Sequence, residues 1–424
     1  MNRPIPLEIF RCVARKTPSL RRQLGEGVEK TMCQQYKMTR RQMLGTTLAF
    51  GAAALIPKSR LLANAPAFEL LETKPISNQP EYYYGWPTVA ITKDDELLVT
   101  VSGARETHVC PFGRVEMFRS RDGGATWSWP RTIYDGPTDD RDSGVLVTDK
   151  GTILVTTFTS NAYAEQLKNE IKRRSEGKGN FSDERFEKWM SVHRRVSDEE
   201  REKELGSWIF RSTDDGVNFE ARRRVAVNSP HGPVQRRDGT LFYPGCELWT
   251  PERRVAVWTS SDDGQSWEFL SQIPARDGDD PQQYHELHGV EAADGTLIVQ
   301  IRNHNKTNAQ ETLQTESTDG GATWSQPHTI GVWGLPSHLI RLADERLLMT
   351  YGHRRAPFGN QARVSADNGK TWSEPMILAG NDASRDLGYP STVQMSDGSL
   401  VSVWYEQPEP GTNAVVQMVK WRLM

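Results

Sequence analysis

The feature that most constrains this chain is a short segment that recurs five times, with serine, aspartate, glycine and an aromatic residue in a fixed order. One copy reads "STDGGATWSQP" (Ser317–Pro327). The other four are "SRDGGATWSWP" (Ser120–Pro130), "STDDGVNFE" (Ser212–Glu220), "SSDDGQSWEF" (Ser260–Phe269) and "SADNGKTWSEP" (Ser365–Pro375). We call this segment the box. Recurrence of this kind indicates a repeat architecture, in which each copy belongs to one supersecondary unit.

The residue types in the box suit a turn better than a reaction. The aspartate can accept hydrogen bonds from backbone N–H groups of its own turn, the glycines tolerate positive φ, and the aromatic ring can pack between sheets. We therefore expect the boxes to build the scaffold, and the chemistry to lie elsewhere.

Each box is preceded by a second pattern, an apolar strand followed by a tight turn and another apolar strand. Such patterns, typical of β-hairpins with Asp-Gly or similar turns, begin at Thr88, Gly144, Pro233, Gly289, His338 and Ser391. The last hairpin is followed by the strand-like segment Asn413–Leu423, which has no box. Six four-stranded units predict an all-β fold, a six-bladed β-propeller spanning residues 68–424. We expect a strand near Phe68–Pro75 to complete the last blade.

The second unit is roughly forty residues longer than the others. The additional segment, residues 162–205, is charged and rich in helix-forming residues, with sparse apolar positions. We expect a helical insertion on the surface of blade 2, either a lid or a solvated decoration.

The N-terminal region has the pattern of an export signal. In residues 38–67, Arg40 and Arg41 precede a mildly apolar run that is too short to span a bilayer, and small residues follow at Ala63–Ala67. This resembles a bacterial twin-arginine signal and predicts export to the periplasm or beyond, without stable membrane insertion. Residues 1–37 precede it as an extension that is either disordered or untranslated, since Met38 is a plausible start. An amphipathic N-terminal helix is the alternative.

Composition excludes some functions. The 52 basic and 55 acidic residues give a net charge of −3, which provides no electrostatic footprint for nucleic acid. Only Cys110 and Cys246 follow the signal region, so a disulfide scaffold is excluded, although these two could pair.

If boxes and hairpin turns mark one face of the propeller, the loops on the opposite face contain an unusual set of polar residues. Seven of the nine histidines lie there: His108, His231, His285, His288, His304, His338 and His353. They are joined by Arg105, Arg141, Arg302, Arg354 and Arg385, and by Glu106, Asp140, Asp142, Glu247, Glu286, Asp386 and Tyr389. This set predicts a concave polar pocket at the axis for a ligand rich in hydroxyl groups or anionic.

At this point the chain resembles the sialidase superfamily, whose Asp-boxes match the five boxes. The resemblance implies a tyrosine nucleophile before the first strand of the last blade, where Tyr389 lies, and a glutamate partner at Glu286. It implies substrate-binding arginines at Arg302, at Arg354 or Arg355, and at Arg105. A carboxylate can take the proton of a phenol, and paired guanidinium groups can hold a carboxylate.

Two positions depart from the sialidase pattern. Gly85 in "YGWP" stands where sialidases have an arginine, and the acid/base aspartate expected after Arg105 is absent. Glu106, His108, or the pair Asp140 and Asp142 could replace it. We therefore predict Tyr389, Glu286, His108 and Asp142 as catalytic candidates. The predicted substrate-binding residues are Arg105, Arg141, Arg302, Arg354, His231, His288, His304, His353 and Arg385.

Three functions fit these residues. The first is an exported retaining exo-glycosidase that acts on terminal sugars of a glycan or polysaccharide, with sialic acids among the candidates. The second is a polysaccharide lyase that acts on uronates by β-elimination, and the third is a non-catalytic glycan-binding propeller. No cofactor is predicted. The run "YHELH" permits a metal, but its histidine spacing differs from that of a HExxH zinc site, so we predict none.

Overall fold

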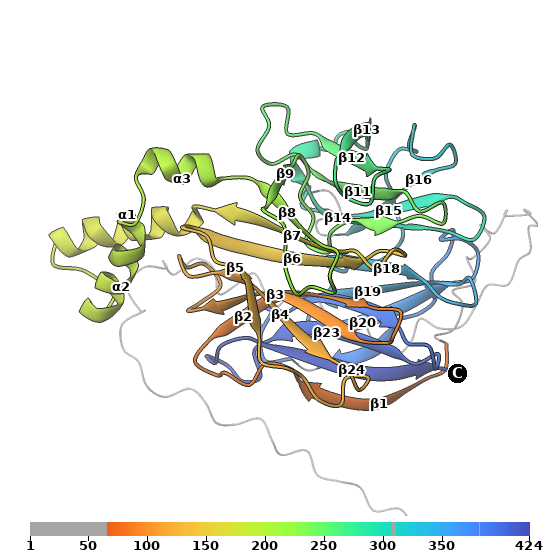
Figure 1. Cartoon of the computed structure of the whole chain (residues 1–424), viewed down its shortest axis with the longest axis horizontal. Coiled ribbons are helices and arrows are strands. Elements are labelled where there is room, and N and C mark those ends of the chain that lie inside the picture. The colour runs from red at the N-terminus through yellow and green to blue at the C-terminus, as the bar shows by residue number, and fades with distance from the viewer. Residues whose placement is uncertain (1–65, 307–310, 381) are drawn as a thin grey trace, which may run out of the picture. The chain divides into compact units, whose positions relative to one another are not determined.

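The computed structural model describes residues 66–306, 311–380 and 382–424. Their strands form six four-stranded antiparallel sheets, the six blades of a β-propeller (Figure 1). The predicted fold class is therefore confirmed. The predicted signal and the extension before it lie almost entirely outside the described residues. None of the helices in the described ranges is long and apolar enough to cross a membrane.

Each blade except the last uses four consecutive strands. Blade 1 contains β2 (Tyr83–Ile91), β3 (Leu97–Arg105), β4 (Arg114–Ser120) and β5 (Arg131–Tyr134). Blade 2 contains β6 (Asp139–Val147), β7 (Ile153–Ser160), β8 (Ser207–Ser212) and β9 (Arg223–Val225). Blade 3 contains β10 (Val234–Gln235), β11 (Leu241–Cys246), β12 (Val255–Ser260) and β13 (Glu268–Gln272).

The second half of the chain repeats this order. Blade 4 contains β14 (Tyr284–Glu291), β15 (Leu297–Asn303), β16 (Thr312–Ser317) and β17 (His328–Thr329), and a short 3₁₀ turn, η1 (Pro281–Gln283), precedes it. Blade 5 contains β18 (Ser337–Arg341), β19 (Leu347–His353), β20 (Gly359–Ser365) and β21 (Met376–Gly380). Blade 6 contains β22 (Gly388–Gln394), β23 (Leu400–Glu406), β24 (Val415–Leu423) and β1 (Phe68–Pro75).

The last blade joins the two ends of the propeller. Strand β1 pairs with β24 in an antiparallel register that runs from Phe68 opposite Leu423 to Pro75 opposite Gln417. The strand expected near Phe68–Pro75 is thus the outermost strand of blade 6. This pairing ties the start of the domain to its end, so neither edge of the ring is left open.

The boxes form the turns predicted for them. In the fourth box, the Asp319 carboxylate accepts hydrogen bonds from the Ser317 hydroxyl (2.7 Å), the Thr323 backbone N–H (2.9 Å) and the Thr323 hydroxyl (2.6 Å). The backbone N–H of Gly321 in turn donates to Ser317 Oγ (2.8 Å). The same serine–aspartate and glycine–serine bonds recur in the other four boxes.

The box aromatics connect neighbouring blades. The Trp324 ring is 9% exposed, and its Nε1–H donates to Ser271 Oγ of blade 3 (2.9 Å). Trp372 donates in the same way to Gln314 of blade 4 (3.0 Å). The boxes therefore hold the ring of blades together and have a structural role.

Three helices lie between β7 and β8 of blade 2, at the left of Figure 1: α1 (Ala162–Ser175), α2 (Asp183–His193) and α3 (Asp198–Glu204). The sequence suggested too few apolar residues for a core here. The helices nevertheless enclose a small one, in which Tyr163, Leu167 and Trp189 pack against Cys110 of blade 1. Trp189 Nε1 also donates to the Glu106 carboxylate (3.3 Å). Cys110 and Cys246 are both buried and free.

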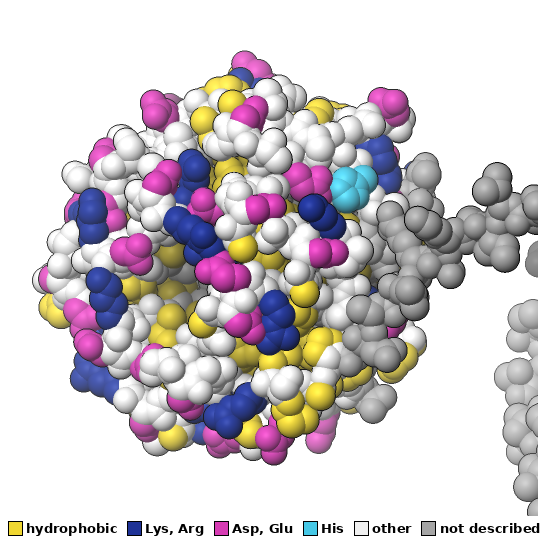
Figure 2. All heavy atoms as spheres, turned by 90° about the vertical axis from the view of Figure 1, so that its right-hand side faces the viewer, with side chains coloured by type: hydrophobic (Ala, Val, Ile, Leu, Met, Phe, Trp, Pro, Cys, Tyr) yellow, Lys and Arg dark blue, Asp and Glu magenta, His cyan; other side chains and the backbone are white. Residues whose placement is uncertain are grey.

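Figure 2 shows the molecule from the side on which the C-terminus lies in Figure 1. Acidic and basic side chains are interspersed on this face, and hydrophobic side chains are visible in hollows between them. The last residues of β22 and the first of β23 lie toward this end, because Gln394 pairs with Leu400 and Leu400 with Trp421 near the C-terminus. The residues that begin the innermost strands therefore lie at the opposite end.

Candidate active site

Four residues near the start of innermost strands share an unusual backbone conformation. Trp86, Asp142, Glu286 and Tyr389 have φ of 55°, 40°, 42° and 52°, although none is glycine. Each lies where the pairing of its strand with the next one shifts register, in β2, β6, β14 and β22. A bulge re-aims a side chain, and positive φ at a non-glycine residue is a strained conformation that clusters at functional sites.

The centre of the site is formed by Tyr389, Glu286 and Arg302. The Tyr389 hydroxyl donates to Glu286 Oε1 (2.5 Å), and Arg302 Nη1 donates both to Glu286 Oε2 and to the Tyr389 oxygen (3.0 Å). A carboxylate that accepts the phenol's hydrogen bond is positioned to take its proton. This arrangement is that of an activated nucleophile with its base.

The charges at the centre favour an ionised Glu286 and a protonated Tyr389 in the resting site. Burial raises the pKa of Glu286, but Arg302 and the Tyr389 hydroxyl outweigh it, so the pKa is lowered. Burial and the Glu286 charge together raise the pKa of Tyr389 well above its ordinary value. Proton transfer to Glu286 must therefore accompany attack by the phenol rather than precede it.

Asp142 is a second carboxyl group near the centre, and its surroundings favour a proton at neutral pH. Burial, and next the charge of Glu286, raise the pKa of Asp142 to about 7, although Arg141, Arg105 and Arg302 oppose the shift. Two neighbouring carboxyl groups whose environments separate their pKa values are typical of an acid and base pair. Asp142 is thus the candidate proton donor, beside the ionised Glu286.

Two further arginines flank the centre. The Arg354 guanidinium lies 5.5 Å from the Tyr389 ring centroid and donates from Nε and Nη2 to the Leu387 carbonyl (2.9 and 2.6 Å). Arg141 lies 4.4 Å from the Trp86 ring centroid and donates to the His108 carbonyl (3.1 Å). With Arg302 they give the site a positive lining that suits an anionic ligand.

His108 belongs to a second polar group next to the centre. Its Nδ1 lies 3.0 Å from Asp386 Oδ1 and 3.0 Å from the Tyr83 hydroxyl. The Tyr83 and Tyr405 hydroxyls each donate to Asp386 (3.0 Å). Since the His108 side chain is 44% exposed, this histidine–aspartate pair could exchange a proton with a ligand.

Comparison of the sequence with known protein families shows the family of this chain. The model of the BNR repeat-like domain matches residues 181–402, which is more than half of the chain. The chain belongs to the BNR repeat-like family. Four of the five boxes lie within the matched residues, and the sialidase-like propeller predicted from the sequence is confirmed.

Solved structures agree on the fold. A protein of unknown function from Dyadobacter fermentans is 20% identical, with a TM-score of 0.68 over 85% of this chain and 100% of that one. A Hadza microbial sialidase is 17% identical, with a TM-score of 0.57 over 80% of this chain and 65% of that one. A variant of NanB sialidase from Streptococcus pneumoniae is 13% identical, with a TM-score of 0.58 over 84% and 70%.

A curated relative is a xyloglucanase from Paenibacillus sp, 25% identical over 240 residues. The match covers 50% of this chain but only 21% of the relative. The matched half of this chain thus spans about a fifth of the length of that enzyme.

The structure corrects the predicted role of Arg105. This residue is fully buried, and its guanidinium donates to both carboxylate oxygens of Asp139 (2.6 and 2.9 Å) and to Ser102 Oγ (2.8 Å). A side chain with no exposed surface and an ion-pair partner cannot grip a substrate. Arg105 instead fixes the end of β3 to the start of β6.

His231 and His288, predicted to bind substrate, lie apart from the Tyr389–Glu286 centre. They are 2% and 4% exposed and form a cluster with His338, with ring centroids 4.4 to 5.5 Å apart. His288 follows Glu286 by two residues along β14, so the cluster lies one layer farther along the axis than the catalytic centre. The alternation of strand side chains places them in the channel below the site.

The other predicted residues lie around the rim. His304 Nε2 accepts from Arg302 Nε (2.8 Å), so it orients that arginine. His353, at the end of β19, lies 3.0 Å from the Pro357 carbonyl through its Nδ1. Arg385 is exposed in the segment before β22. Among the described residues, no group of three or more His, Cys, Asp or Glu side chains is arranged to hold a metal ion.

Sequence reasoning missed the aromatic wall of the site. Trp86, Tyr83 and Tyr405 pack with Tyr389 in one buried cluster, with the Trp86 and Tyr389 centroids 6.4 Å apart. The tyrosines and tryptophan of "EYYYGWP" were the available signal, because that segment runs into the start of β2 just as "SRDLGYP" runs into the start of β22. Trp86 occupies in blade 1 the bulged position that Tyr389 occupies in blade 6.

Proposed function

We propose that the protein is an exported retaining exo-glycosidase that removes terminal, preferably anionic sugars from glycans. The observation that supports this most directly is the hydrogen bond from the Tyr389 hydroxyl to Glu286 within reach of Arg302. A tyrosine paired with a carboxylate is the nucleophile of a known exception among retaining glycosidases. Relatives that include sialidases and a xyloglucanase are consistent with glycan hydrolysis.

In the first step, the Tyr389 oxygen attacks the anomeric carbon while its proton passes to Glu286. The bond to the leaving oxygen breaks, and Asp142 gives that oxygen its proton, which produces a free alcohol and a tyrosyl glycoside. In the second step, Asp142 takes a proton from water, which attacks the same carbon. The Tyr389 oxygen leaves and recovers its proton from Glu286, so the two inversions give net retention.

The arginines account for the proposed substrate class. Arg302 donates to the Tyr389 oxygen and the Arg354 guanidinium lies 5.5 Å from the Tyr389 ring centroid, so their remaining N–H groups can hold a carboxylate next to the reacting carbon. Because a phenol attacks in its neutral form, it approaches such a carbon with less repulsion than a carboxylate nucleophile would.

The test is hydrolysis of a panel of 4-methylumbelliferyl glycosides, including the sialoside and the glucuronide, by the wild type and by Tyr389→Phe. Tyr134→Phe, a partly buried tyrosine of β5 outside the site, is the matched control. We expect fluorescence from the wild type and the control but not from Tyr389→Phe, with retained anomeric configuration by NMR. Equal activity of Tyr389→Phe and wild type would contradict the proposal.

A polysaccharide lyase is the second candidate, and the His108–Asp386 pair favours it. An imidazole held by a carboxylate could remove the proton next to an arginine-bound uronate carboxylate and eliminate the substituent at the β position. The products would be unsaturated uronides that absorb in the ultraviolet. Formation of such products, lost in His108→Ala and kept in Glu286→Gln, would establish this function instead.

A glycan-binding propeller without catalysis would show neither signal. Its affinity for a glycan should survive both Tyr389→Phe and Glu286→Gln, because neither change removes the arginines.

The proposed export is tested separately by cell fractionation, in which Arg40→Lys with Arg41→Lys should retain the protein in the cytoplasm. The same fractionation with wild type provides the reference.

A further inference from the structure

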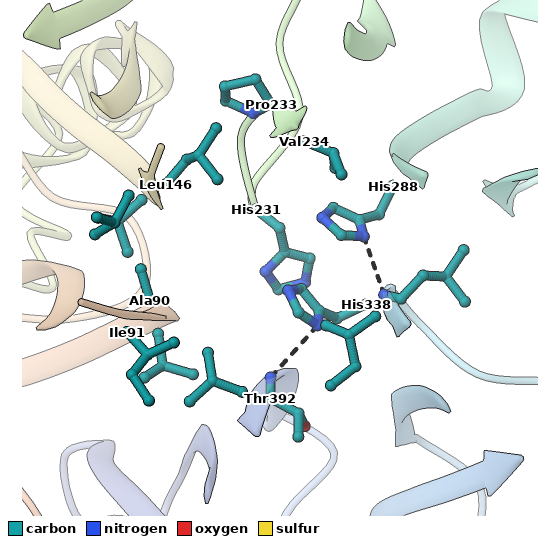
Figure 3. A pocket seen from close by; sticks show the side chains of 15 residues that line it. Ala90, Ile91, Leu146, His231, Pro233, Val234, His288, His338 and Thr392 are labelled. Carbon is teal, nitrogen blue, oxygen red and sulfur yellow. Dashed lines mark hydrogen bonds between the residues drawn. The ribbon is translucent and has the colours of Figure 1, made fainter. Parts of the chain in front are cut away.

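The centre of the propeller contains a cavity below the candidate active site. It has a volume of about 180 Å³ and is lined by residues of all six blades. It extends away from Tyr389 and Glu286, because its lining residues are the later ones of each innermost strand, such as Val89–Ile91 and Val145–Val147. It thus lies toward the face seen in Figure 2 and is shown from close by in Figure 3.

The closed end of this cavity is a layer of three histidines from successive blades. His231, His288 and His338 belong to blades 3, 4 and 5, and all three are at most 7% exposed. The His231 ring centroid lies 6.4 Å from that of Tyr389, so the layer forms the floor beneath the nucleophile. Nothing in the proposed hydrolysis uses these imidazoles.

Backbone hydrogen bonds fix the tautomers of two of them. The Leu339 N–H donates to His288 Nδ1 (3.0 Å) and the Thr392 N–H to His338 Nδ1 (3.4 Å), as the dashed lines in Figure 3 show. A backbone amide can only donate, so each Nδ1 must carry a lone pair. Burial lowers the pKa of His288 to about 3, so the ring is neutral and its single proton is on Nε2.

His231 completes the set with an unsatisfied atom. Its Nδ1 lies 3.2 Å from the Thr88 hydroxyl, which also lies 3.3 Å from the Pro230 carbonyl, so either tautomer of His231 fits these contacts. Its Nε2 is buried without a hydrogen-bond partner in the part of the chain that the structure describes. A buried polar atom without a partner costs free energy unless a ligand or water satisfies it. No protein partner for the Nε2 atoms of His288 and His338 is found among the described residues either.

The protonation of these histidines favours a ligand that accepts hydrogen bonds over a metal ion. A metal ion would need lone pairs on Nε2, and the proton would then have to sit on Nδ1, facing a backbone N–H. N–H groups on Nε2 instead match the oxygens of a carboxylate. Below them the walls are aliphatic, formed by Val89, Val145, Val234, Ile340 and Val393 among others.

We propose that this cavity binds a small aliphatic carboxylic acid, with its carboxylate at the Nε2–H groups of His288 and His338 beside His231, and its chain between the aliphatic walls. The volume holds about six groups of water size, at roughly 30 Å³ each, which matches an acid of about four carbons. The site is independent of the proposed hydrolysis, since it uses none of its residues.

The probe is butyrate, with n-butanol as a neutral ligand of the same chain length, and both are titrated calorimetrically into the mature protein. We expect saturable binding of butyrate and none of butanol. Binding should be lost in His231→Phe, and it should persist in His328→Gln, a matched change at an exposed histidine of β17, and in Tyr389→Phe. Long-range ¹H–¹⁵N spectra should show the Nε2–H tautomer for His288 and His338.

Several results would overturn the proposal: no saturable binding of butyrate, equal binding of butanol, unchanged binding in a folded His231→Phe, or Nδ1–H tautomers. If His231→Phe fails to fold, as judged by its thermal transition, Val234→Phe replaces it, because the larger ring fills the channel from β10 without touching the histidines' hydrogen bonds. Butyrate affinity unchanged in Val234→Phe would likewise overturn the proposal.

Discussion

The Tyr389 hydroxyl and the Glu286 carboxylate lie 2.5 Å apart although 103 residues separate them in the chain. Each is held at positive φ at a register shift near the start of an innermost strand, in blades 6 and 4. The two bulges aim both side chains at the axis, where Arg302 contacts both. A repeated backbone feature of the propeller thus assembles the site.

Replacement of Glu286 by glutamine should remove the base without removing volume. We expect kcat for the preferred glycoside to fall by about 10²–10⁴-fold, the usual contribution of a positioned proton acceptor. The thermal transition should change little. Glu291→Gln, at the end of the same strand β14 as Glu286, is the matched control. A kcat for Glu286→Gln within twofold of that control would argue against proton transfer to Glu286.

Asp142→Asn should separate proton donation from nucleophilic attack. Glycosides with a good leaving group such as 2,4-dinitrophenol need no protonation in the first step, so kcat/KM for them should change little, whereas kcat should fall because water lacks its base in the second step. Natural glycosides should be cleaved about 10²–10⁴-fold more slowly. Equal losses of kcat/KM on both substrates would assign the aspartate a structural role. His108→Ala, compared in parallel, shows whether the proton comes instead from the His108–Asp386 pair.

The pH profile should report the same two carboxyl groups. Asp142 must be protonated, so kcat/KM should decrease as the pH rises through about 7, the raised pKa of that group. Glu286 must be ionised, and its lowered pKa places the acidic limb below the ordinary glutamate range. In Asp142→Asn the alkaline limb should disappear for substrates with good leaving groups. A limb that remains there would have another origin.

Arg354→Ala tests the anionic substrate class. Charge-assisted hydrogen bonds contribute about 1.5–3 kcal/mol, so kcat/KM should fall by roughly 10–150-fold for a substrate that carries a carboxylate. A neutral glycoside of the same leaving group should be affected much less. If kcat/KM falls equally for the two substrates, Arg354 acts by positioning Tyr389 and Leu387, which it contacts. Other residues would then bind the substrate carboxylate.

The fold was predictable because its signals are local. A box or hairpin turn is specified by four or five neighbouring residues, as Ser317, Asp319 and Thr323 illustrate, and the six hairpins correspond to the six blades. The centre of the site was predictable only through resemblance to a family. The bulges that aim Glu286 and Tyr389 depend on pairing with a second strand, which composition alone does not show.

The errors in the site have one physical cause, which is that burial is not visible in a polar residue's identity. Arg105 is indistinguishable by type from Arg302, yet Asp139 neutralises it inside the protein. His288 lies two positions beyond Glu286 and therefore in the channel rather than in the site. Trp86 was overlooked for the converse reason, because an aromatic residue is usually assigned to the core.

Trp324→Ala should destabilise the propeller by about 3–5 kcal/mol, as other buried aromatic truncations do. The change removes a ring packed between blades 3 and 4 and also leaves Ser271 Oγ without its indole donor. Urea denaturation measures the effect. Trp129→Ala is the matched control, because that tryptophan is 74% exposed and should change the free energy of unfolding very little. Similar values for the two variants would contradict the role assigned to the box.

The box aspartates should make stability fall in acid. Hydrogen bonds from the Thr323 hydroxyl and then from the Thr323 backbone N–H lower the pKa of Asp319 to about 2, and the pKa values of Asp122, Asp214 and Asp262 are likewise about 2. A carboxyl group with a depressed folded pKa stabilises the protein above its unfolded pKa, near 3.9, and this contribution is lost as the pH falls toward 2. The temperature of the thermal transition, measured between pH 6 and 2, should therefore decrease steeply below about pH 4.

Asp319→Asn should lower the transition temperature at neutral pH and make it less dependent on pH. Asp277→Asn, in the exposed loop before β14, should leave the acid slope unchanged. An identical slope in Asp319→Asn and wild type would show that the box hydrogen bonds do not set acid stability.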